Sequence, residues 1–470
     1  MTDPSGPPAG TESFDAAEIA RLSGGLLVHD AGRPIRGAAV DSRRVQPGNL
    51  FVALPGERTD GHEHLAEAIA NGAAAVLVSR PGWPAEGLDS VSVVRVGRPL
   101  DALGAIAAGW RSRFDPLTVG ITGSIAKTST KEAIADVLAI RFRTLRSEGN
   151  ENNEIGLPLT VLRLERADAA LVLEMGMYVG GEIADLARIA RPQIGVVTAV
   201  QPVHLARIGS IEAIEQAKGE LVEALPANGT AILNADDERV ARMAGRTAAR
   251  VLTYGFGPAA DVTADSIESA GAEGMRFTLR TAFGRQPVSL PGLGRHAVHN
   301  ALAAAAVGSV AGLELEEIAR GLAVRPPAAH RGDLVRLGDV TILDDSYNAA
   351  PASMRAALAV LADLSGRHVA VLGEMLELGD GHEAGHLDVG RRAAQVAELL
   401  IVVGAGAAPI ARAAREAGMA TGRVIEVADR QAALEALLPR LAPGDVILVK
   451  ASRGLALDRL IDELQIELEP

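Results

Sequence analysis

Short apolar runs alternate with Ala-rich stretches of helical periodicity along most of this chain. The strand-like runs are residues 50–54, 73–78, 117–121, 170–173, 194–200, 230–233, 340–343, 369–372, 399–403 and 446–449. Most of these runs are followed by a helical stretch. Because that order places helices against both faces of a sheet, the alternation predicts an α/β fold built on doubly wound, mostly parallel sheets.

The same pattern divides the chain into parts. A Pro/Gly/Ser-rich start predicts a disordered tail, and Pro326-Pro327 marks a hinge before a third α/β unit. Alternating apolar positions near residues 251–290 predict a small antiparallel addition. The predicted segments are the tail at 1–14, an N-terminal domain at 15–112, a central domain at 113–325 and a C-terminal domain at 326–470.

Composition narrows the classes of function. Aromatic residues are only 3% of the 470 residues and the net charge is −13, so we expect no nucleic-acid partner. The lack of cysteine excludes disulfides and thiolate catalysis. The N-terminus has no signal-peptide pattern, and no apolar run reaches the ~18 residues of a membrane span. We therefore expect a cytoplasmic protein without membrane insertion.

A Gly/Ser loop at residues 120–128 lies between a strand and an Ala-rich helix. In that setting backbone N–H groups and a helix N-terminus can bind phosphates, with Lys127 on the phosphate charge and Thr128 on Mg²⁺. The alternative is a chance turn before a helix. The candidate phosphate-site residues are Gly123, Ser124, Ala126, Lys127, Thr128 and Ser129. By itself the loop predicts only nucleotide binding.

Three further polar residues follow or lie near strands of the same predicted sheet. Glu174 ends a buried strand, at the carboxyl edge where α/β proteins bind ligands, although it could also cap a helix. His204 follows the strand at 194–200, and its alternative is a structural histidine. Lys218 lies on a helix, where a solvated surface lysine is the simple interpretation.

Clustered amides and spaced charges supply other candidates. Asn150, Asn152 and Asn153 could form a turn or bind a sugar or peptide. His296 and Asn300 share a helix face, where core packing is the alternative to ligand contact. Beyond the predicted hinge, surface solvation is the alternative for four charged residues. They are Arg331, Asp345, Lys450 and Arg453, of which the last two would suit a peptide carboxylate.

Ordered motifs over the whole chain resemble the Mur ligase family, in particular its D-alanyl-D-alanine-adding branch. The Tyr347-Asn348 block and the block from Lys450 to Arg453 point to that branch. The matching segments are 41–43 with 56–62, 120–128, 149–156, 174–176, 204–205, 217–220, 294–300, 345–351, 373–379 and 450–453. The resemblance implies a central P-loop domain between an N-terminal UDP-binding domain and a C-terminal Rossmann-like domain. It also implies that the protein is a monomer.

The resemblance also implies a reaction. ATP, with Mg²⁺, would phosphorylate the terminal carboxylate of UDP-N-acetylmuramoyl-tripeptide, and D-alanyl-D-alanine would attack the acyl phosphate. The implied catalytic residues are Lys127, Glu174, His204 and Lys218, the last carbamoylated and sharing Mg²⁺ with Thr128, Glu174 and His204. The implied nucleotide contacts are His296, Asn300, Arg331 and Asp345. The implied substrate contacts are Ser42, Arg43, Asn150, Asn152, Asn153, Tyr347, Asn348, Lys450 and Arg453.

Four alanines depart from the family pattern: Ala126, Ala297, Ala350 and Ala451. A left-handed Ala126 would cost on the order of 1–2 kcal/mol, and Ala297 could remove an adenine hydrogen bond worth about 1 kcal/mol. These departures leave two alternatives open. The chain could be another amide ligase of the superfamily, such as a folylpolyglutamate or other muramyl-peptide ligase, or a non-catalytic nucleotide- or precursor-binding scaffold.

Overall fold

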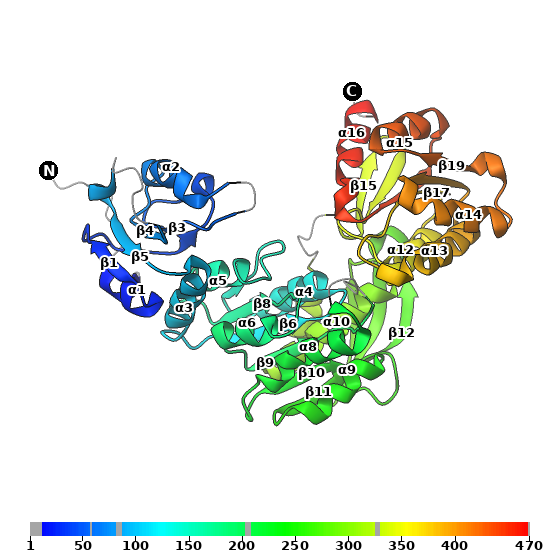
Figure 1. The fold of residues 1–470 in the computed structure, drawn as a ribbon. Helices are drawn as coiled ribbons and strands as arrows, with labels where there is room; N and C mark the ends of the chain where they lie inside the picture. The colour runs from blue at the N-terminus through cyan, green and yellow to red at the C-terminus, as the bar shows by residue number, and fades with distance from the viewer. Residues whose placement is uncertain (1–11, 57–58, 81–86, 203–207, 325–329, 469–470) are drawn as a thin grey trace.

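The computed structural model describes residues 12–56, 59–80, 87–202, 208–324 and 330–468. These residues form three α/β units in chain order, each around its own parallel or mostly parallel sheet (Figure 1). The predicted fold class is confirmed. None of the helices in this described part of the chain is both long and apolar enough to cross a membrane.

The N-terminal unit has a five-stranded sheet in the order β1-β5-β4-β3-β2. Its strands are β1 (Leu26–His29), β2 (Ala38–Ala39), β3 (Leu50–Val52), β4 (Ala75–Val78) and β5 (Ser92–Arg95). Its helices are α1 (Ala16–Ser23), α2 (Leu65–Ala70) and α3 (Pro99–Arg111). Only the edge strand β1 runs antiparallel to its neighbour.

The central unit has a six-stranded, fully parallel sheet in the order β11-β10-β9-β6-β8-β7. Its strands are β6 (Leu117–Thr122), β7 (Thr144–Arg146), β8 (Ala170–Glu174), β9 (Ile194–Val197), β10 (Thr230–Asn234) and β11 (Arg250–Tyr254). Its helices are α4 (Lys127–Ala139), α5 (Gly156–Val161), α6 (Glu182–Ala190), α8 (Ile211–Glu223), α9 (Glu238–Arg242), α10 (Gly294–Val310) and α11 (Leu315–Leu322).

A three-stranded antiparallel sheet packs beside α10. Its strands are β12 (Thr263–Ser269), β13 (Met275–Thr281) and β14 (Gly284–Leu290). The antiparallel addition is therefore present but was predicted to start too early. Residues 250–254 pair in parallel with β10 and extend the main sheet, because their apolar side chains pack there as a further strand.

The C-terminal unit has a six-stranded sheet in the order β15-β16-β20-β17-β18-β19, in which only the edge strand β15 is antiparallel. Its strands are β15 (Asp333–Leu337), β16 (Val340–Asp344), β17 (Arg367–Gly373), β18 (Leu399–Val403), β19 (Val424–Val427) and β20 (Asp445–Lys450). Its helices are α12 (Pro351–Asp363), α13 (His382–Val396), α14 (Ala408–Glu416), α15 (Arg430–Leu437) and α16 (Asp458–Leu468).

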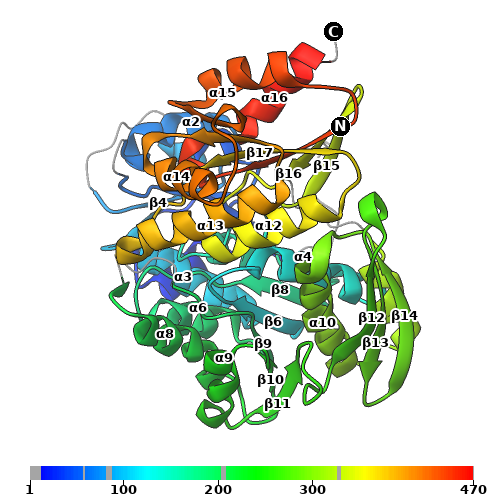
Figure 2. The same ribbon diagram turned by 90° about the vertical axis from the view of Figure 1, so that its right-hand side faces the viewer.

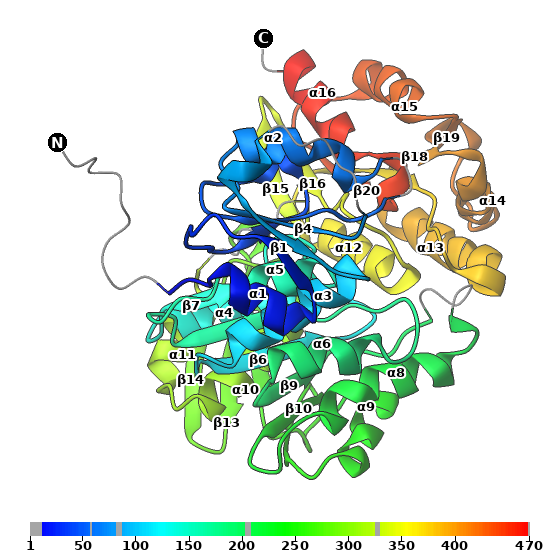
Figure 3. The same cartoon turned by 60° about the vertical axis from the view of Figure 1, so that its left-hand side comes forward.

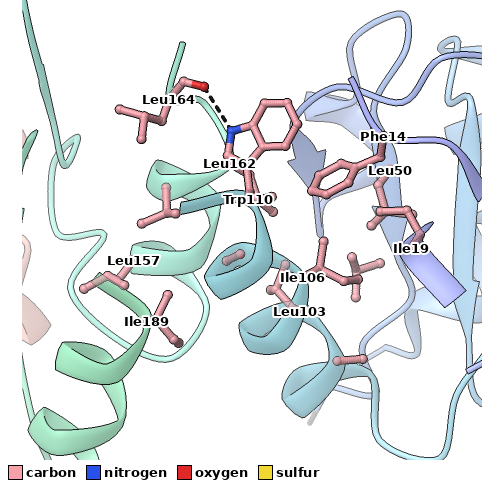
Figure 4. Packing of buried hydrophobic residues seen from close by; sticks show 14 of the residues in the cluster. Phe14, Ile19, Leu50, Leu103, Ile106, Trp110, Leu157, Leu162, Leu164 and Ile189 are labelled. Atoms are coloured by element: carbon pink, nitrogen blue, oxygen red, sulfur yellow. Dashed lines mark hydrogen bonds between the residues drawn. The ribbon is translucent and has the colours of Figure 1, made fainter. Parts of the chain in front are cut away.

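The N-terminal and central units share one hydrophobic core. Helix α3 packs against α5 and α6, and Figure 3 shows it between the two units. The indole N–H of Trp110 donates to the Leu164 carbonyl at 2.9 Å, and the Trp110 ring lies 4.5 Å from that of Phe14 (Figure 4). Phe14 is only 2% exposed and its backbone pairs with Ile35, so assigning it to a disordered tail was wrong. Burial of its aromatic side chain removes apolar surface from water, and this stabilises the ordered position of the residue.

The C-terminal unit contacts the central unit through α10 and α12. Figure 2 shows α12 and α13 between the C-terminal sheet and the central unit. Leu293, just before α10, belongs to a C-terminal core cluster, and a Cβ on Gly294 would lie 2.6 Å from Val360. The predicted hinge at Pro326-Pro327 and the candidate ligand His204 both lie outside the described residues.

Candidate active site

The loop between β6 and α4 has the backbone geometry of a phosphate-binding loop. Gly123 has a φ of 154°, and a Cβ there would lie 1.8 Å from the Thr198 hydroxyl oxygen, so only glycine fits. The Ser124 N–H donates to the Ala199 carbonyl at 2.8 Å. Ala126 takes the left-handed conformation with a φ of 66°. The loop is thus held against the segment after β9 and ends at the N-terminus of α4, where anions bind favourably.

Lys127 begins α4 and folds back over the loop. Its ammonium donates to the Gly123 carbonyl at 2.8 Å. Desolvation lowers the pKa of Lys127; the Glu174 carboxylate opposes this shift, and the Arg331 guanidinium adds to it. Arg331, from the C-terminal unit, therefore lies within electrostatic range of the loop lysine, and two cations converge where phosphate charge would bind.

Glu174 ends β8 and is held from two sides. The Thr128 hydroxyl donates to its Oε2, and the Asn152 side-chain amide donates to its Oε1, both at 2.8 Å. The carboxylate is 2% exposed. Ser129, next to Thr128, is half-buried and makes no side-chain hydrogen bond with the described residues. The carboxyl edge of the sheet thus presents a hydroxyl and a carboxylate as adjacent oxygen donors.

Lys218 lies on α8 and is 4% exposed. Burial lowers the pKa of this lysine well below its ordinary value, and the nearby Lys127 cation lowers it further. Its ammonium has no hydrogen-bond or ion-pair partner among the described residues. The structure therefore groups Lys127, Thr128, Glu174 and Lys218, and Lys218 is buried rather than a solvated surface lysine.

The three clustered asparagines have different surroundings. Asn152 bonds to Glu174 as described, and its carbonyl accepts the Gly176 N–H at 2.7 Å. The Asn153 side-chain oxygen accepts the N–H groups of Ile155 and Gly156, as in the turn alternative. Asn150 is exposed. Of the three, Asn150 is the one whose side chain makes no hydrogen bond with the described residues.

A pocket of about 160 Å³ opens beside these groups. Its lining includes Lys127, Asn152 and Asn153, together with Tyr178 from the loop after β8 and Glu182 from the start of α6. The Glu182 carboxylate accepts the Tyr178 N–H at 2.5 Å, which fixes that loop. Neither residue was predicted from the sequence, although Tyr178 follows Glu174 by only four positions at the same sheet edge.

On α10, the predicted adenine-side residues face different neighbours. Asn300 is 8% exposed and accepts a 3.4 Å bond from the Thr130 hydroxyl, beneath the phosphate-loop helix. His296 faces the C-terminal unit. Its pKa is lowered first by desolvation between the units and also by the Lys450 cation, while Asp345 opposes this shift.

A second histidine on α10 was not predicted. The His299 ring lies 5.0 Å from the ring of Tyr254 and 5.4 Å from that of Phe256. Its Nε2 is 3.4 Å from an Asp236 oxygen, and the Arg295 guanidinium lies 4.5 Å from the Phe256 ring. This aromatic and polar group stands next to the predicted adenine side, one helical turn from His296.

The C-terminal unit presents two guanidiniums against one ring. Arg331 lies 4.0 Å and Arg453 4.8 Å from the Tyr347 ring centroid. Lys450 is different: it is 2% exposed, and its ammonium is 2.6 Å from Asp345 Oδ2. The structure thus separates the predicted Lys450–Arg453 pair, because Lys450 is neutralised inside its own domain and only Arg453 remains at the ring.

The neighbouring alanines have structural explanations. Ala350 precedes α12, and its N–H donates to the Ser353 hydroxyl at 3.0 Å, which supplies a helix-end contact. Ala451 is fully buried, and a Cβ on Gly373 would lie 2.7 Å from its methyl group. The Asn348 side-chain oxygen accepts the Ala349 N–H at 2.9 Å, and the Asn348 backbone carbonyl accepts a hydrogen bond from the Lys450 ammonium.

At the N-terminal unit, the two predicted contacts are already paired. The Ser42 hydroxyl donates to Glu67 at 2.6 Å. Arg43 pairs with Asp41 at 2.7 Å, and this hydrogen bond lowers the pKa of Asp41 to about 2.

A pocket of about 640 Å³ lies beside these residues, between the N-terminal and central units. Its lining from the N-terminal unit includes Arg36, Arg44 and Asn49, and that from the central unit includes Arg163 and Arg166. These four guanidiniums stand among the lining carboxylates of Glu12, Asp41, Glu148, Glu151 and Glu165, and Arg163 and Arg166 pair with Glu151 and Glu12, so the pocket offers groups of both charges to a ligand. The sequence did not indicate these arginines, because they lie outside the recognised motifs and far apart along the chain.

Comparisons with known proteins agree with this geometry. Three family descriptions match: the Mur ligase family catalytic domain over residues 34–111, the Mur ligase middle domain over 121–308, and the Mur ligase glutamate ligase domain over 330–453. The UDP-N-acetylmuramoyl-tripeptide--D-alanyl-D-alanine ligase of Mycobacterium tuberculosis H37Rv is 41% identical, with 95% of this chain and 97% of the relative covered.

Solved structures are similar over nearly the same extent. A crystal structure of MurF from Acinetobacter baumannii matches with a TM-score of 0.87 and 30% identity, covering 97% of this chain and 99% of the other. The MurF ligase of Thermotoga maritima in complex with ADP matches with a TM-score of 0.80 and 28% identity, covering 92% and 98%.

Proposed function

The chain belongs to the Mur ligase family, and on that basis we propose that it joins D-alanyl-D-alanine to UDP-N-acetylmuramoyl-tripeptide at the expense of ATP. The product is a precursor of peptidoglycan. The observation that carries this proposal is the 41% identity, across 95% of the chain, to a relative named for that reaction. The site contributes the chemistry that such a reaction needs.

The phosphate loop and two cations serve the ATP phosphates. Loop N–H groups and the start of α4 bind the phosphate oxygens, and Lys127 neutralises their charge. Arg331 approaches from the C-terminal unit and adds a second cation. Phosphoryl transfer depends mainly on such positioning and charge neutralisation, so a protein nucleophile is not required.

The donor set at the sheet edge fits Mg²⁺. The Thr128 hydroxyl and the Glu174 carboxylate are hard oxygen ligands, and His204 and a carbamoylated Lys218 complete the proposed set. A bound Mg²⁺ would neutralise phosphate charge and orient the phosphate oxygens. The buried amine of Lys218, with a lowered pKa and no partner among the described residues, supports carbamoylation, because only the uncharged amine adds to CO₂ and the carbamate would gain a partner.

The two organic substrates enter from opposite units. We propose that the UDP portion binds near the 640 Å³ pocket and that the peptide reaches the 160 Å³ pocket beside Lys127. The dipeptide carboxylate would bind Arg453 beside Tyr347. The tripeptide carboxylate attacks the γ-phosphorus of ATP, ADP leaves, and the dipeptide amine then displaces phosphate from the acyl phosphate. Closing of the C-terminal unit would exclude water.

We propose that the enzyme is a monomer and that it acts in the cytoplasm, where ATP and the precursor are supplied. The scaffold alternative rests on the substituted alanines. It is disfavoured by the intact hydrogen bonds among Thr128, Glu174 and Asn152, which a non-catalytic binder would have no need to preserve.

The test is phosphate release by the purified protein with Mg²⁺ and bicarbonate. We expect release only when ATP, UDP-N-acetylmuramoyl-tripeptide and D-alanyl-D-alanine are all present. Lys127→Ala should abolish the release of phosphate. Binding of the UDP precursor to this variant should persist. Release with a different amino-acid acceptor would favour another ligase of the family, and no release with any acceptor would favour a scaffold.

A further inference from the structure

A second large pocket lies at the opposite edge of the central sheet. It has a volume of about 820 Å³ and is lined by residues that precede β6 and β9, together with the ends of α3, α6 and α8. The phosphate loop follows β6, whereas this pocket lies before it. A strand of six residues spans roughly 20 Å, so the pocket is separate from the candidate active site.

Arg111 forms the floor of this pocket. It is 3% exposed, and its guanidinium donates to the Ala190 and Phe114 carbonyls and to the Thr118 hydroxyl at 2.7–2.9 Å. All three acceptors are neutral, and no carboxylate of the described residues contacts it. A buried charge is normally paired, so Arg111 brings uncompensated positive charge to the pocket.

Arg191 adds a second charge at the rim. It ends α6 in the left-handed conformation with a φ of 52°, where glycine is the usual residue. Its guanidinium has no partner among the described residues. Burial lowers the pKa of Arg111, the Asp115 carboxylate opposes this shift and the Arg191 cation adds to it, so Asp115 and Arg191 both lie within electrostatic range of Arg111.

Two further charged residues complete the lining. Arg188 lies one turn before Arg191, and its contact with Asp185 at 3.2 Å is exposed and therefore weak. Asp115 is an exposed carboxylate that offsets part of the charge. Three guanidiniums against one lining carboxylate leave a surplus that a polyanion would neutralise.

We infer that this pocket binds a phosphorylated small molecule, with its phosphate between Arg188 and Arg191 above Arg111. Guanidinium forks match phosphate oxygens in geometry as well as charge. The volume is within the range of small-molecule sites and accommodates more than a bare phosphate. Ala224 and Pro226, which follow the helix of Lys218, also line the pocket, so the ligand would contact the chain directly after that helix.

The test uses pyrophosphate as the probe and isothermal titration of the full chain. Lys127→Ala weakens binding at the phosphate loop, and substitution of the pocket arginines then shows how much of the remaining binding occurs in this pocket. In that background, Arg188→Ala with Arg191→Gly should weaken pyrophosphate binding at least tenfold. Arg250→Ala is the matched control, since Arg250 is an exposed arginine at the same sheet edge but outside the pocket, and it should bind as before.

Folding is monitored separately, because glycine suits the left-handed backbone at 191 and Arg191→Gly should not lower the melting temperature. Two outcomes would overturn the inference: no pyrophosphate binding in the Lys127→Ala protein, or binding that survives the double arginine substitution. Both of these binding results are independent of ligase turnover. Turnover can be measured separately in the arginine variants that retain Lys127.

Discussion

Glu174 and Asn152 are joined by a 2.8 Å hydrogen bond from the asparagine amide to the carboxylate, across the carboxyl edge of the central sheet. The bond leaves Glu174 with one donor on each oxygen, since Thr128 supplies the other. It assigns Asn152 a positioning role that the sequence did not suggest.

Asn152→Ala should therefore lower kcat/KM about tenfold to a hundredfold, corresponding to about 1–3 kcal/mol for an unsatisfied buried acceptor. The main effect should appear in the Mg²⁺ concentration needed for half-maximal rate, because Glu174 loses its orientation. Glu273→Ala, at an exposed position between β12 and β13, is the control and should change neither quantity by more than about twofold. Equal losses in the two variants would contradict the positioning role.

Lys218→Ala should be nearly inactive and should regain part of its rate in acetate, which can supply the missing carboxylate. Since burial lowers the pKa of Lys218 well below its ordinary value, a larger fraction of the amine is uncharged at a given pH and able to react with CO₂. Wild-type protein labelled with ¹³C-bicarbonate should give a carbamate NMR signal that the variant lacks. Activity that is indifferent to removal of CO₂ would count against carbamoylation.

Ala126→Gly should raise both stability and ATP affinity. The residue has a φ of 66°, which costs an L-amino acid on the order of 1–2 kcal/mol, and glycine removes that cost. Combined with Ala297→Asn, the change should tighten ATP binding roughly tenfold to a hundredfold. Ala133→Gly, in the interior of the same helix, should instead destabilise by about 1 kcal/mol. Calorimetry and ATP titration distinguish these results, and a loss of affinity in Ala126→Gly would refute the account.

Arg331 and Arg453 contact the same Tyr347 ring but should serve different substrates. Arg331→Ala should raise KM for ATP about tenfold or more. Arg331 lies within electrostatic range of Lys127, and its loss would remove one of the two cations at the phosphate loop. Arg453→Ala should raise KM for D-alanyl-D-alanine by a similar factor and leave that for ATP unchanged. Steady-state kinetics with each substrate varied in turn give both values, and parallel changes in the two variants would show that the arginines are not specialised.

Asp236 should make stability depend on acid pH. The His299 hydrogen bond, aided by the Phe256 and Gly257 N–H groups, lowers the pKa of Asp236 from 3.8 to about 2. A lowered carboxyl pKa stabilises the fold above about pH 4, and the benefit is lost as the pH falls towards 2. Asp236 is 32% exposed, so we expect Asp236→Asn to cost about 1–2 kcal/mol at pH 7.

Urea denaturation between pH 7 and pH 3 tests this dependence. The difference between wild type and Asp236→Asn should stay constant down to about pH 4 and then shrink. Asp101→Asn, which removes an exposed ion pair with Arg98, should show a small difference throughout. A difference that grew on acidification would contradict the assigned direction of the shift.

The sequence predicted most of the buried parallel strands, because they appear as apolar runs between helices, but it did not predict the interior strand β5, in which only Val93 and Val94 are consecutive apolar residues. It also did not predict the edge strands β1, β2, β7, β15 and β19, which are short or partly exposed. It placed the start of the antiparallel sheet at 251, since alternation alone does not show which neighbour a strand pairs with.

The sequence predicted the parts of the candidate site that are formed by residues close together along the chain. It did not predict contacts between residues that lie far apart along the chain. The phosphate loop and the position of Glu174 follow from strand and helix order. The ion pair between Lys450 and Asp345 joins residues 105 positions apart, and it depends on β20 lying next to β16. The aromatic surroundings of His299 likewise come from β11 and the loop after it, which no motif links to α10.

The core shared around Trp110 has a consequence for domain exchange between related enzymes. Phe14, Trp110 and Leu157 belong to one buried cluster, so a chimera joined at residue 112 would divide that core between two parents. The parental side chains would have to match in volume for such a hybrid to fold. The C-terminal unit has its own cores, and of their described buried members a junction after α11 separates only Leu293 from the rest. Acceptor specificity can therefore be exchanged between relatives as a C-terminal module, whereas precursor recognition must be transferred together with the central domain.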